Sequence, residues 1–407
     1  MAVRLTPAEN LLAVPGIRLA STSAGIYARQ RPDLALIEFG EDASVSAVFT
    51  RNSFAAAPVL VARQHKNQSV SLRFCLINAG NANAGTGIKG VAAAHATCRK
   101  LAELADCQTE MVLPFSTGVI GQDLPVDKIN SALPELLADL SEHHWMKCAE
   151  TIITTDTMTK GISRQLELGG RTVTITGIAK GSGMIRPDMA TMLAYIGTDA
   201  AVDRELLQQV LVNAVGVSFN RICVDGDMST NDACVLIATG KAKNSILSKQ
   251  DEIGLAKFQQ AINEVCSHLA TAIVRDGEGA SKFISVRIER GANSQECLDS
   301  AYAVATSPLV KTAFFASDPN WGRILAAIGR AGIADLDISR ISVYLNECRI
   351  VSQGARAAEY TEAAGQKVMQ ESEIILRIDL DRGTVTETVW TCDLSYDYVK
   401  INADYRS

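Results

Sequence analysis

The segment from Lys180 to Leu193 has the arrangement of a self-cleaving bond in front of a threonine nucleophile. A turn that contains glycine and proline leads to the small residue Ala190, then to the hydroxyl residue Thr191, then to an apolar run. Cleavage between them would give Thr191 a free α-amino group beside its hydroxyl, so that one residue carries both a base and a nucleophile. The structural alternative is that Thr191 simply begins a strand. The local sequence alone favours that alternative, because threonine is common where loops enter strands.

Histidine offers no convincing base for such a nucleophile. None of the five histidines lies in a glycine-rich turn, and no H-E-x-x-H metal motif occurs, so neither a Ser-His-Asp triad nor a metal site is expected. A free α-amino group has a reference pKa of about 7.7–8.0, against about 10.4 for lysine, so part of it is neutral near pH 7. The liberated amine of Thr191 is therefore the natural candidate for the base.

Two small polar segments could serve this site. The segment 114–121 follows an apparent strand at 111–113, and it can point backbone N–H groups and a hydroxyl at a developing oxyanion, or it is a plain turn. The run 78–87 holds three asparagines and three glycines. It allows the backbone to approach a ligand or another chain closely, or it is a packed loop whose asparagines bond their own backbone.

Three further loops carry charged groups. The loop 221–232 begins like a calcium loop, but Thr230 and Leu236 stand where glycine and an acidic residue are needed, which leaves a polar network beneath an active site or a structural turn. Glu278 lies between two glycines and either binds an ammonium group or is a solvated turn residue. The segment 318–324 looks like a capped helix start, and both a functional and a structural role are open for it.

Composition restricts the class of protein. The formal net charge of the 407 residues is −6 and the pI is about 5.5, so the chain has no electrostatic reason to bind nucleic acid or an anionic membrane. Ten scattered cysteines form no C-x-x-C pair, which indicates a reducing compartment. The first residues lack the apolar core of a signal peptide, and no apolar stretch reaches the roughly 20 residues of a membrane span. We expect a cytoplasmic protein.

The expected elements alternate between strands and helices, which predicts α/β layers in two domains or in one large layered body. Many strands are apolar on both faces, so helices should cover the sheets. The expected strands are 34–39, 44–50, 73–78, 172–178, 192–196, 233–238, 283–289, 342–346, 374–380 and 385–392. The expected helices are 91–105, 127–140, 203–215, 251–274, 293–304 and 355–368, with a turn at 167–171.

Taken in order, these segments resemble the ornithine acetyltransferase family (glutamate N-acetyltransferase, the ArgJ family). No single match is specific, but the ordered set spans nearly the whole chain. The matching segments are 14–18, 48–52, 78–85, 116–121, 154–157, 180–193, 224–227, 276–282, 318–323 and 398–407.

The resemblance implies a layered helix–sheet sandwich similar to N-terminal-nucleophile enzymes. It also implies self-cleavage between Ala190 and Thr191 into an α chain of residues 1–190 and a β chain of residues 191–407, which assemble as two α and two β chains. Thr191 would take acetyl from N-acetylornithine as an ester and pass it to L-glutamate. By the same resemblance, Thr117 and Gly118 form the oxyanion hole. The implied substrate contacts are Thr157, Lys180, Thr191, Glu278, Asn402 and Ser407.

Two alternatives remain at this point. An amidohydrolase or aminopeptidase of the N-terminal-nucleophile kind would keep the nucleophile and use water as the acceptor. A binding protein would never be cleaved, although its need for so many glycine-rich polar turns is hard to explain. No metal or cofactor is expected, and acetyl-CoA enters only as a second acetyl donor, whose use the sequence does not decide.

Overall fold

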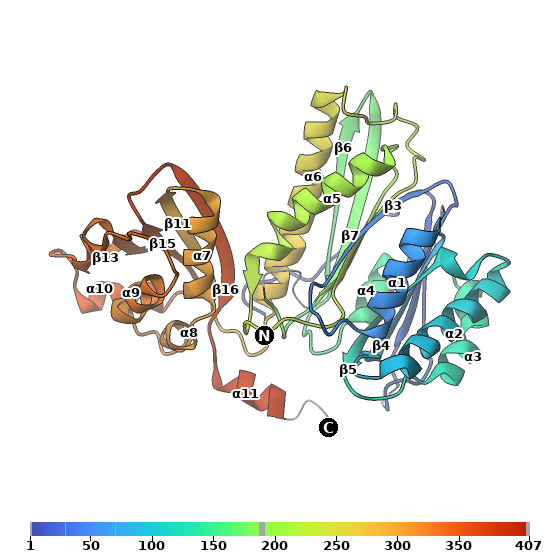
Figure 1. Cartoon of the computed structure of the whole chain (residues 1–407), viewed down its shortest axis with the longest axis horizontal. Helices are drawn as coiled ribbons and strands as arrows, with labels where there is room; N and C mark the ends of the chain where they lie inside the picture. The colour runs from blue at the N-terminus through green and yellow to red at the C-terminus, as the bar shows by residue number, and fades with distance from the viewer. Residues whose placement is uncertain (1, 29, 70, 187–191, 404–407) are drawn as a thin grey trace.

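The computed structural model describes residues 2–28, 30–69, 71–186 and 192–403. These residues form three sheets (Figure 1), with strand orders β1-β2-β4-β5, β3-β10-β8-β7-β6 and β14-β13-β12-β15-β11-β16-β9. The strands of the first two sheets are β1 (Ile17–Thr22), β2 (Leu34–Phe39), β3 (Ser44–Phe49), β4 (Phe74–Asn81), β5 (Val112–Val119), β6 (Lys160–Leu168), β7 (Arg171–Lys180), β8 (Leu193–Thr198) and β10 (Ala233–Ala238). Those of the third are β9 (Ile222–Cys223), β11 (Phe283–Gly291), β12 (Ser342–Leu345), β13 (Cys348–Ser352), β14 (Ala355–Arg356), β15 (Glu373–Asp379) and β16 (Val385–Cys392).

The first two sheets pack face to face, because their strands are apolar on both sides. In β8, Leu193 and Tyr195 enter the core between the sheets, while Ala194 and Ile196 enter the core on the opposite face. Successive side chains of a strand point to opposite faces, so this alternation buries both. The outer faces are covered by helices: α1 (Ala57–Gln68), α2 (Gly87–Ala105) and α3 (Val126–Ala138) over the first sheet, α5 (Arg204–Gly216) and α6 (Glu252–Arg275) over the second. The result is a four-layer helix–sheet–sheet–helix sandwich.

The third sheet has a core of its own. It packs against α7 (Ser294–Ala305), α8 (Pro308–Phe315) and α9 (Trp321–Gly329), and Figure 1 shows this unit to the left of the sandwich. The chain passes from α6 to β11 through the loop that carries Glu278, and it leaves β16 for the C-terminal helix α11 (Tyr396–Ala403). Both connections therefore lie where the two units meet.

The predicted α/β layered fold is confirmed, and most expected strands agree with the structure to within a few residues. One predicted helix is wrong. The range 355–368 begins with the short strand β14, which pairs with β13, and only α10 (Glu362–Met369) is helical. Thr361 sets the start of α10, because its side-chain hydroxyl accepts the amide N–H of Ala364. The segment after 111–113, predicted as a turn, is also different, since β5 continues to Val119.

The predicted division into chains at the Ala190–Thr191 bond falls in residues 187–191, outside the described residues, and stays a prediction. The strands on either side of it, β7 and β8, pair antiparallel in one sheet. Within the described residues, no helix is long and apolar enough to span a bilayer.

The surroundings of Gly197 show that the core between the two sheets is closely packed. A Cβ atom there would lie 2.4 Å from Cδ1 of Ile17 and 2.9 Å from Cη2 of Trp145, which belongs to helix α4 (Trp145–Ile152). We expect Gly197→Ala to lower the free energy of unfolding by about 1–3 kcal/mol through overpacking, as measured by urea denaturation. Gly216→Ala is the matched control, because a Cβ atom at that position would have nothing within 4 Å. Equal stability of the two variants would contradict this packing.

Candidate active site

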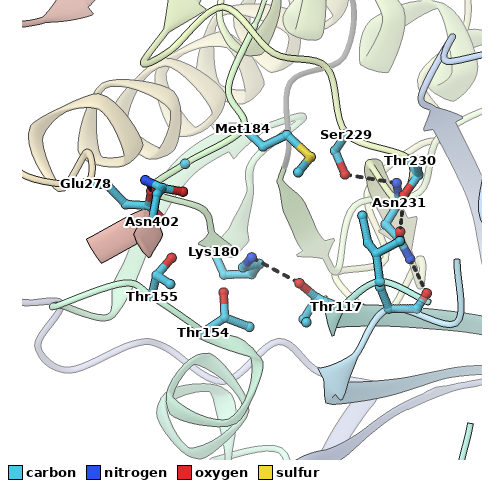
Figure 2. A pocket seen from close by; sticks show the side chains of 14 residues that line it. Thr117, Thr154, Thr155, Lys180, Met184, Ser229, Thr230, Asn231, Glu278 and Asn402 are labelled. Carbon is cyan, nitrogen blue, oxygen red and sulfur yellow. Dashed lines mark hydrogen bonds between the residues drawn. The ribbon is translucent and has the colours of Figure 1, made fainter. Parts of the chain in front are cut away.

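The main candidate site is a pocket at one edge of the sandwich, where the loop after α6 and the helix α11 meet the ends of strands (Figure 2). Its cavity volume is about 130 Å³. Its lining residues are Ala82, Thr117, Gly118, Ile120, Thr154, Thr155, Lys180, Gly183, Met184, Ser229, Thr230, Asn231, Glu278 and Asn402.

The register of the second sheet explains why distant residues meet here. Strands β8 and β10 are parallel, with Leu193 opposite Ala233, so both begin at the same edge. Strand β7 runs antiparallel to β8 and ends at that edge, with Lys180 opposite Leu193. Ala190 and Thr191 lie outside the described residues, but Met192 is the next residue in the chain after Thr191. The structure therefore places Lys180 across from the start of the strand that follows the predicted nucleophile.

Lys180 connects this edge to the other sheet. Its Nζ donates to Oγ1 of Thr117, at the end of β5, over 3.1 Å. Burial lowers the pKa of Lys180 from its ordinary value, although Asp156, Asp232 and Glu278 act in the opposite direction. An ammonium group has no acceptor, so the Thr117 oxygen accepts this bond and keeps its own proton for another partner. That partner would lie in the pocket.

Gly118 adopts a conformation that only glycine tolerates. Its φ is +131°, and a Cβ atom would lie 2.3 Å from the carbonyl carbon of Gly80 on the neighbouring strand β4. A side chain is excluded both by this contact and by the dihedral angle. The predicted pair Thr117-Gly118 thus lies in the pocket wall, next to Lys180.

Glu278 and Asn402 form the opposite wall. The side-chain amide of Asn402, on α11, donates to Oε2 of Glu278 over 2.8 Å, and the backbone N–H of Glu278 donates to the carbonyl of Ser182 over 2.8 Å. Gly183 makes room for the carboxylate, because a Cβ there would lie 2.4 Å from its carboxyl carbon. The carboxylate of Glu278 is thus held in place and 8% exposed, with an oxygen available to a cation.

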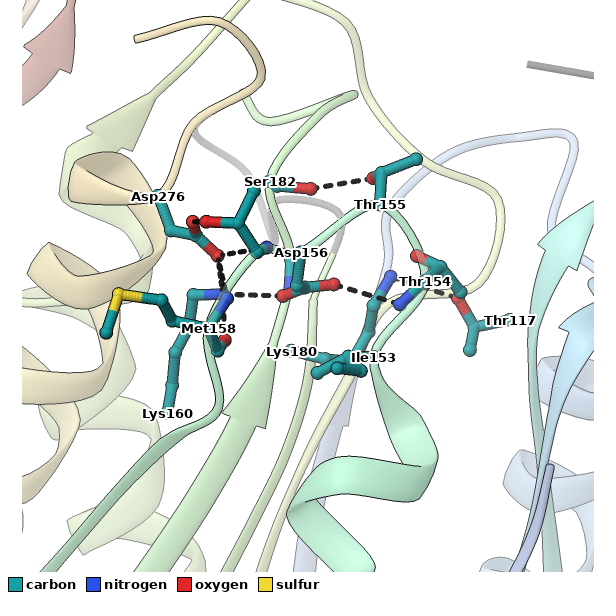
Figure 3. Close-up of polar contacts among 12 residues, drawn as sticks. Thr117, Ile153, Thr154, Thr155, Asp156, Met158, Lys160, Lys180, Ser182 and Asp276 are labelled. Carbon is teal, nitrogen blue, oxygen red and sulfur yellow. Dashed lines mark hydrogen bonds and ion pairs between the residues drawn. The ribbon is translucent and has the colours of Figure 1, made fainter. Parts of the chain in front are cut away.

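A buried ion cluster connects three segments of the site, which lie around residues 156, 181 and 276 (Figure 3). Nζ of Lys160 lies 2.6 Å from Oδ1 of Asp156 and 2.6 Å from Oδ2 of Asp276, and all three side chains are 0–1% exposed. Asp156 also accepts the N–H of Gly181, next to Lys180, over 2.7 Å. Burial would raise the pKa of Asp156, but Lys160 and Lys180 bring it well below its ordinary range. Asp276 lies at the start of the loop that carries Glu278. Lys160 therefore holds the wall at Lys180 through Asp156 and the wall at Glu278 through Asp276.

Thr157 does not line this pocket but an adjoining cavity, which shares Thr155 and Glu278 with it. Its hydroxyl donates to Asp276, and its backbone N–H donates to the same carboxylate over 3.0 Å. The neighbours Thr154 and Thr155 line the pocket instead, and Oγ1 of Thr155 is 2.7 Å from Oγ of Ser182. The contact of Thr157 with substrate stays a prediction. So do those of Thr191 and Ser407, which lie outside the described residues.

The contacts of the other loops show which groups their polar side chains bind. In the run 78–87 the asparagines bond nearby backbone: Nδ2 of Asn81 donates to the carbonyls of residues 122 and 123, and Oδ1 accepts the N–H of Asn83 over 2.7 Å. In the loop 221–232, Asp225 accepts the N–H groups of Met184 and Ile185 over 2.6 and 2.9 Å, so it is a polar support for the segment before the predicted cleavage bond. Asn320 caps α9 and is structural.

Sequence reasoning missed several residues of this site. Thr154 and Thr155 lie in a matching segment, but the resemblance implies a substrate contact only for Thr157. Ser229, Thr230 and Asn231 belong to the loop 221–232, for which a polar network beneath an active site was one of the two expectations. No local pattern connects them with Thr117, because those contacts form only when the two sheets pack. The ion cluster was missed for the same reason. Among the described residues, no group of three or more histidine, cysteine, aspartate or glutamate side chains could hold a metal ion.

Substitution of Lys160 tests whether the ion cluster holds the loops of the site in place. Lys160→Met leaves Asp156 and Asp276 buried without their cation, which should lower the free energy of unfolding by about 3–5 kcal/mol in chemical denaturation. The control is Lys89→Met, which removes a 2.5 Å ion pair with Asp123 between two exposed side chains. We expect no measurable change there, since exposed pairs contribute little. If both variants are equally stable, the cluster does not anchor the site.

Comparison with known proteins identifies the family. Residues 18–407 match the family model described as the ArgJ family. The chain is 56% identical to the arginine biosynthesis bifunctional protein ArgJ of Pseudomonas fluorescens (strain Pf0-1) and 54% identical to that of Pseudomonas syringae pv. tomato, in both cases over 407 residues and 100% of each chain.

Among solved structures, the chain is similar to the arginine biosynthesis bifunctional protein of Bacillus halodurans, with 38% identity, 50% of this chain and 95% of that one covered, and a TM-score of 0.48. It is also similar to ornithine acetyltransferase of Mycobacterium tuberculosis complexed with ornithine, with 35% identity, 43% and 93% covered, and a TM-score of 0.38. The family expected from the sequence is thus confirmed by the whole-chain matches. The chain belongs to the ArgJ family and is an enzyme of arginine biosynthesis.

Proposed function

We propose that this enzyme transfers the acetyl group of N2-acetyl-L-ornithine to L-glutamate, giving L-ornithine and N-acetyl-L-glutamate. The relatives named above support the pathway. The observation that carries the reaction type is the Lys180–Thr117 contact, at the sheet edge where the strand after Thr191 begins. Glu278 and Asn402 face it across the pocket, so a ligand there would meet the hydroxyl of Thr117 on one side and a carboxylate suited to an ammonium group on the other.

The proposed maturation step is cleavage of the Ala190–Thr191 bond. The hydroxyl of Thr191 attacks the carbonyl carbon of Ala190, the peptide C–N bond breaks, and the nitrogen takes the proton to become a free α-amine. Water then hydrolyses the resulting ester, which leaves a carboxylate on Ala190 and restores the hydroxyl of Thr191. The products are chains 1–190 and 191–407, and the new amine is the base of the next step.

In the proposed first half-reaction, the α-amine of Thr191 accepts the hydroxyl proton while the oxygen attacks the acetyl carbonyl of N-acetylornithine. Negative charge develops on the carbonyl oxygen, where the proton of Thr117 and the backbone at Gly118 would stabilise it. The C–N bond then breaks, the proton passes to the departing nitrogen, and ornithine leaves. The acetyl group remains on Thr191 as an ester.

In the second half-reaction, the amine of L-glutamate attacks the ester carbonyl, N-acetylglutamate leaves, and the hydroxyl of Thr191 regains a proton. The donor and the product are both amides, so the transfer is nearly balanced in energy and can run either way. Glu278 is suited to pair with an ammonium group of the substrate. Lys180 either meets its α-carboxylate or holds the active-site loop, and its bond to Thr117 is compatible with both roles.

Further properties belong to the same proposal. Acetyl-CoA would serve as a second donor, which agrees with the description of the relatives as bifunctional. Two α and two β chains would assemble, without a cofactor. The enzyme would work in the cytoplasm, and the ten cysteines, all free and eight of them buried, fit a reducing compartment.

Replacing the nucleophile should remove maturation and transfer together, because one residue supplies both. We expect mass spectrometry of the purified protein to show two fragments that meet at Thr191, and Thr191→Ala to stay at full length without measurable acetyl transfer. Thr198→Ala is the control, since it removes a buried hydroxyl at the other end of β8 and should be cleaved normally. An intact wild-type chain with full activity would refute the proposal.

The identity of the acceptor separates a transferase from an N-terminal-nucleophile hydrolase. With N-acetylornithine present, we expect ornithine release in excess of one equivalent per enzyme only when glutamate is added. Without an amine acceptor, the acetyl ester on Thr191 is not discharged, and the enzyme stops after one turnover. A hydrolase would release ornithine at the same steady rate without glutamate. Substituting acetyl-CoA for N-acetylornithine in this assay tests the second donor, with N-acetylglutamate as the measured product.

A further inference from the structure

Two consecutive residues, Asn231 and Asp232, connect the two sheets at the active-site edge. They immediately precede β10, and both are buried, at 8% and 1% exposure. Asn231 lines the pocket, and its side chain lies beside Ser229 and Thr230 (Figure 2). The mechanism proposed above uses neither of them.

Asn231 holds the strand end that carries Thr117. Its Nδ2 donates to the carbonyl of Ser116 over 2.9 Å and to the carbonyl of Ala82 over 2.7 Å, so both amide protons are used. Its Oδ1 accepts the hydroxyl of Thr230 over 2.7 Å, which fixes the orientation of the amide. Ser116 directly precedes Thr117, so Asn231 positions the backbone from which Thr117 and Gly118 extend.

Asp232 holds the start of the strand that follows Thr191. Its Oδ1 accepts the N–H of Met192 over 3.1 Å, and the carbonyl of Met192 accepts the N–H of Ala233 over 3.1 Å. Both polar groups of the Met192 backbone are thus bound to residues 232 and 233. Because Met192 is joined to Thr191 by a peptide bond, Asp232 restrains the chain directly after the predicted nucleophile.

We propose that the side chains of Asn231 and Asp232 act as positioning residues that set the distance between the nucleophile at position 191 and the oxyanion donors at Thr117 and Gly118. The two strand ends belong to different sheets, and these neighbouring side chains join them through a single peptide unit. This inference rests on the proposed function. A displacement of about 1 Å in such geometry can cost about 100-fold in rate, so a short and rigid connection is effective.

The state of Asp232 suggests a conservative replacement. Burial raises the pKa of its carboxyl well above the ordinary value, and its second oxygen, Oδ2, has no hydrogen-bond partner among the described residues. A neutral carboxyl has nearly the shape and charge of an amide. Asp232→Asn therefore keeps an oxygen acceptor for Met192, whereas Asp232→Ala removes it.

The experiment compares Asn231→Ala, Asp232→Ala, Asp232→Asn and the double alanine variant with two matched controls. Asn52→Ala removes an amide that donates to the carbonyl of Met228 over 2.9 Å in the same loop. Asp199→Ala removes a buried carboxylate that accepts the N–H of Thr174 over 2.7 Å, just after the other end of β8. For each variant, the rate of cleavage at Thr191, the kcat and KM of acetyl transfer, and the thermal unfolding midpoint are measured.

Both single alanine variants should lose about 100-fold in cleavage rate and in kcat. KM should change by less than about threefold, because Glu278 and Asn402 remain and the amide of Asn231 is already bound by protein groups. Asp232→Asn should restore the rate to within about threefold of wild type. The double variant should be no slower than the slower single variant, since both break one connection. The controls should leave kcat unchanged even where they lower the unfolding midpoint as much.

Normal rates in folded Asn231→Ala and Asp232→Ala would overturn the proposal, and so would controls that lose as much kcat. An Asp232→Asn variant as slow as Asp232→Ala would also overturn it. If Asp232→Ala does not fold, Asn231→Ala and Asp232→Asn still decide the question. A wild-type chain that shows neither fragments nor acetyl transfer would instead refute the proposed function, which keeps the two failures distinct.

Discussion

The packing of two sheets through strands that are apolar on both faces determines where polar chemistry can occur in this enzyme. Each such strand contributes side chains to two cores, so a charge within it would be buried at high cost. Polar groups therefore gather at the strand ends. Because β8 and β10 begin and β7 ends at one edge, Lys180 and Asn231 come together there. The position of the candidate active site therefore follows from the strand register.

A buried ion cluster holds the loops at this edge in place. Lys160 lies between Asp156 and Asp276, and each carboxylate orients a different wall of the pocket. A buried cluster of this kind contributes little net stability, because desolvation offsets much of the attraction. Its effect is geometric: the loop of Glu278 cannot shift without separating buried charges. This rigidity is what a site that stabilises a developing oxyanion requires.

The sequence predicted what local patterns and ordered motifs encode. Apolar runs predicted most of the strands, and Thr117, Lys180, Glu278 and Asn402, which the ordered motifs implied, line one pocket. What it could not predict depends on contacts between distant segments: the partner of Thr157, for example, is Asp276. The helix expected at 355–368 failed because the pairing of β14 with β13 outweighed local helical preference. No local pattern marks Asp156, Lys160 and Asp276 as a cluster, because the fold alone brings them together.

The placement of β7 and β8 on either side of the proposed cut has a consequence for how the mature enzyme unfolds. The two strands share a sheet, with six residues of each in register, so the chains produced by the proposed cut would stay joined by that pairing and by the cores on both faces. The proposed cut would then follow folding. Once the mature chains separate, their reassociation is bimolecular and competes with aggregation of exposed strand edges. The lifetime of the mature enzyme would therefore be set by the rate at which it unfolds, whereas its precursor can refold within one chain.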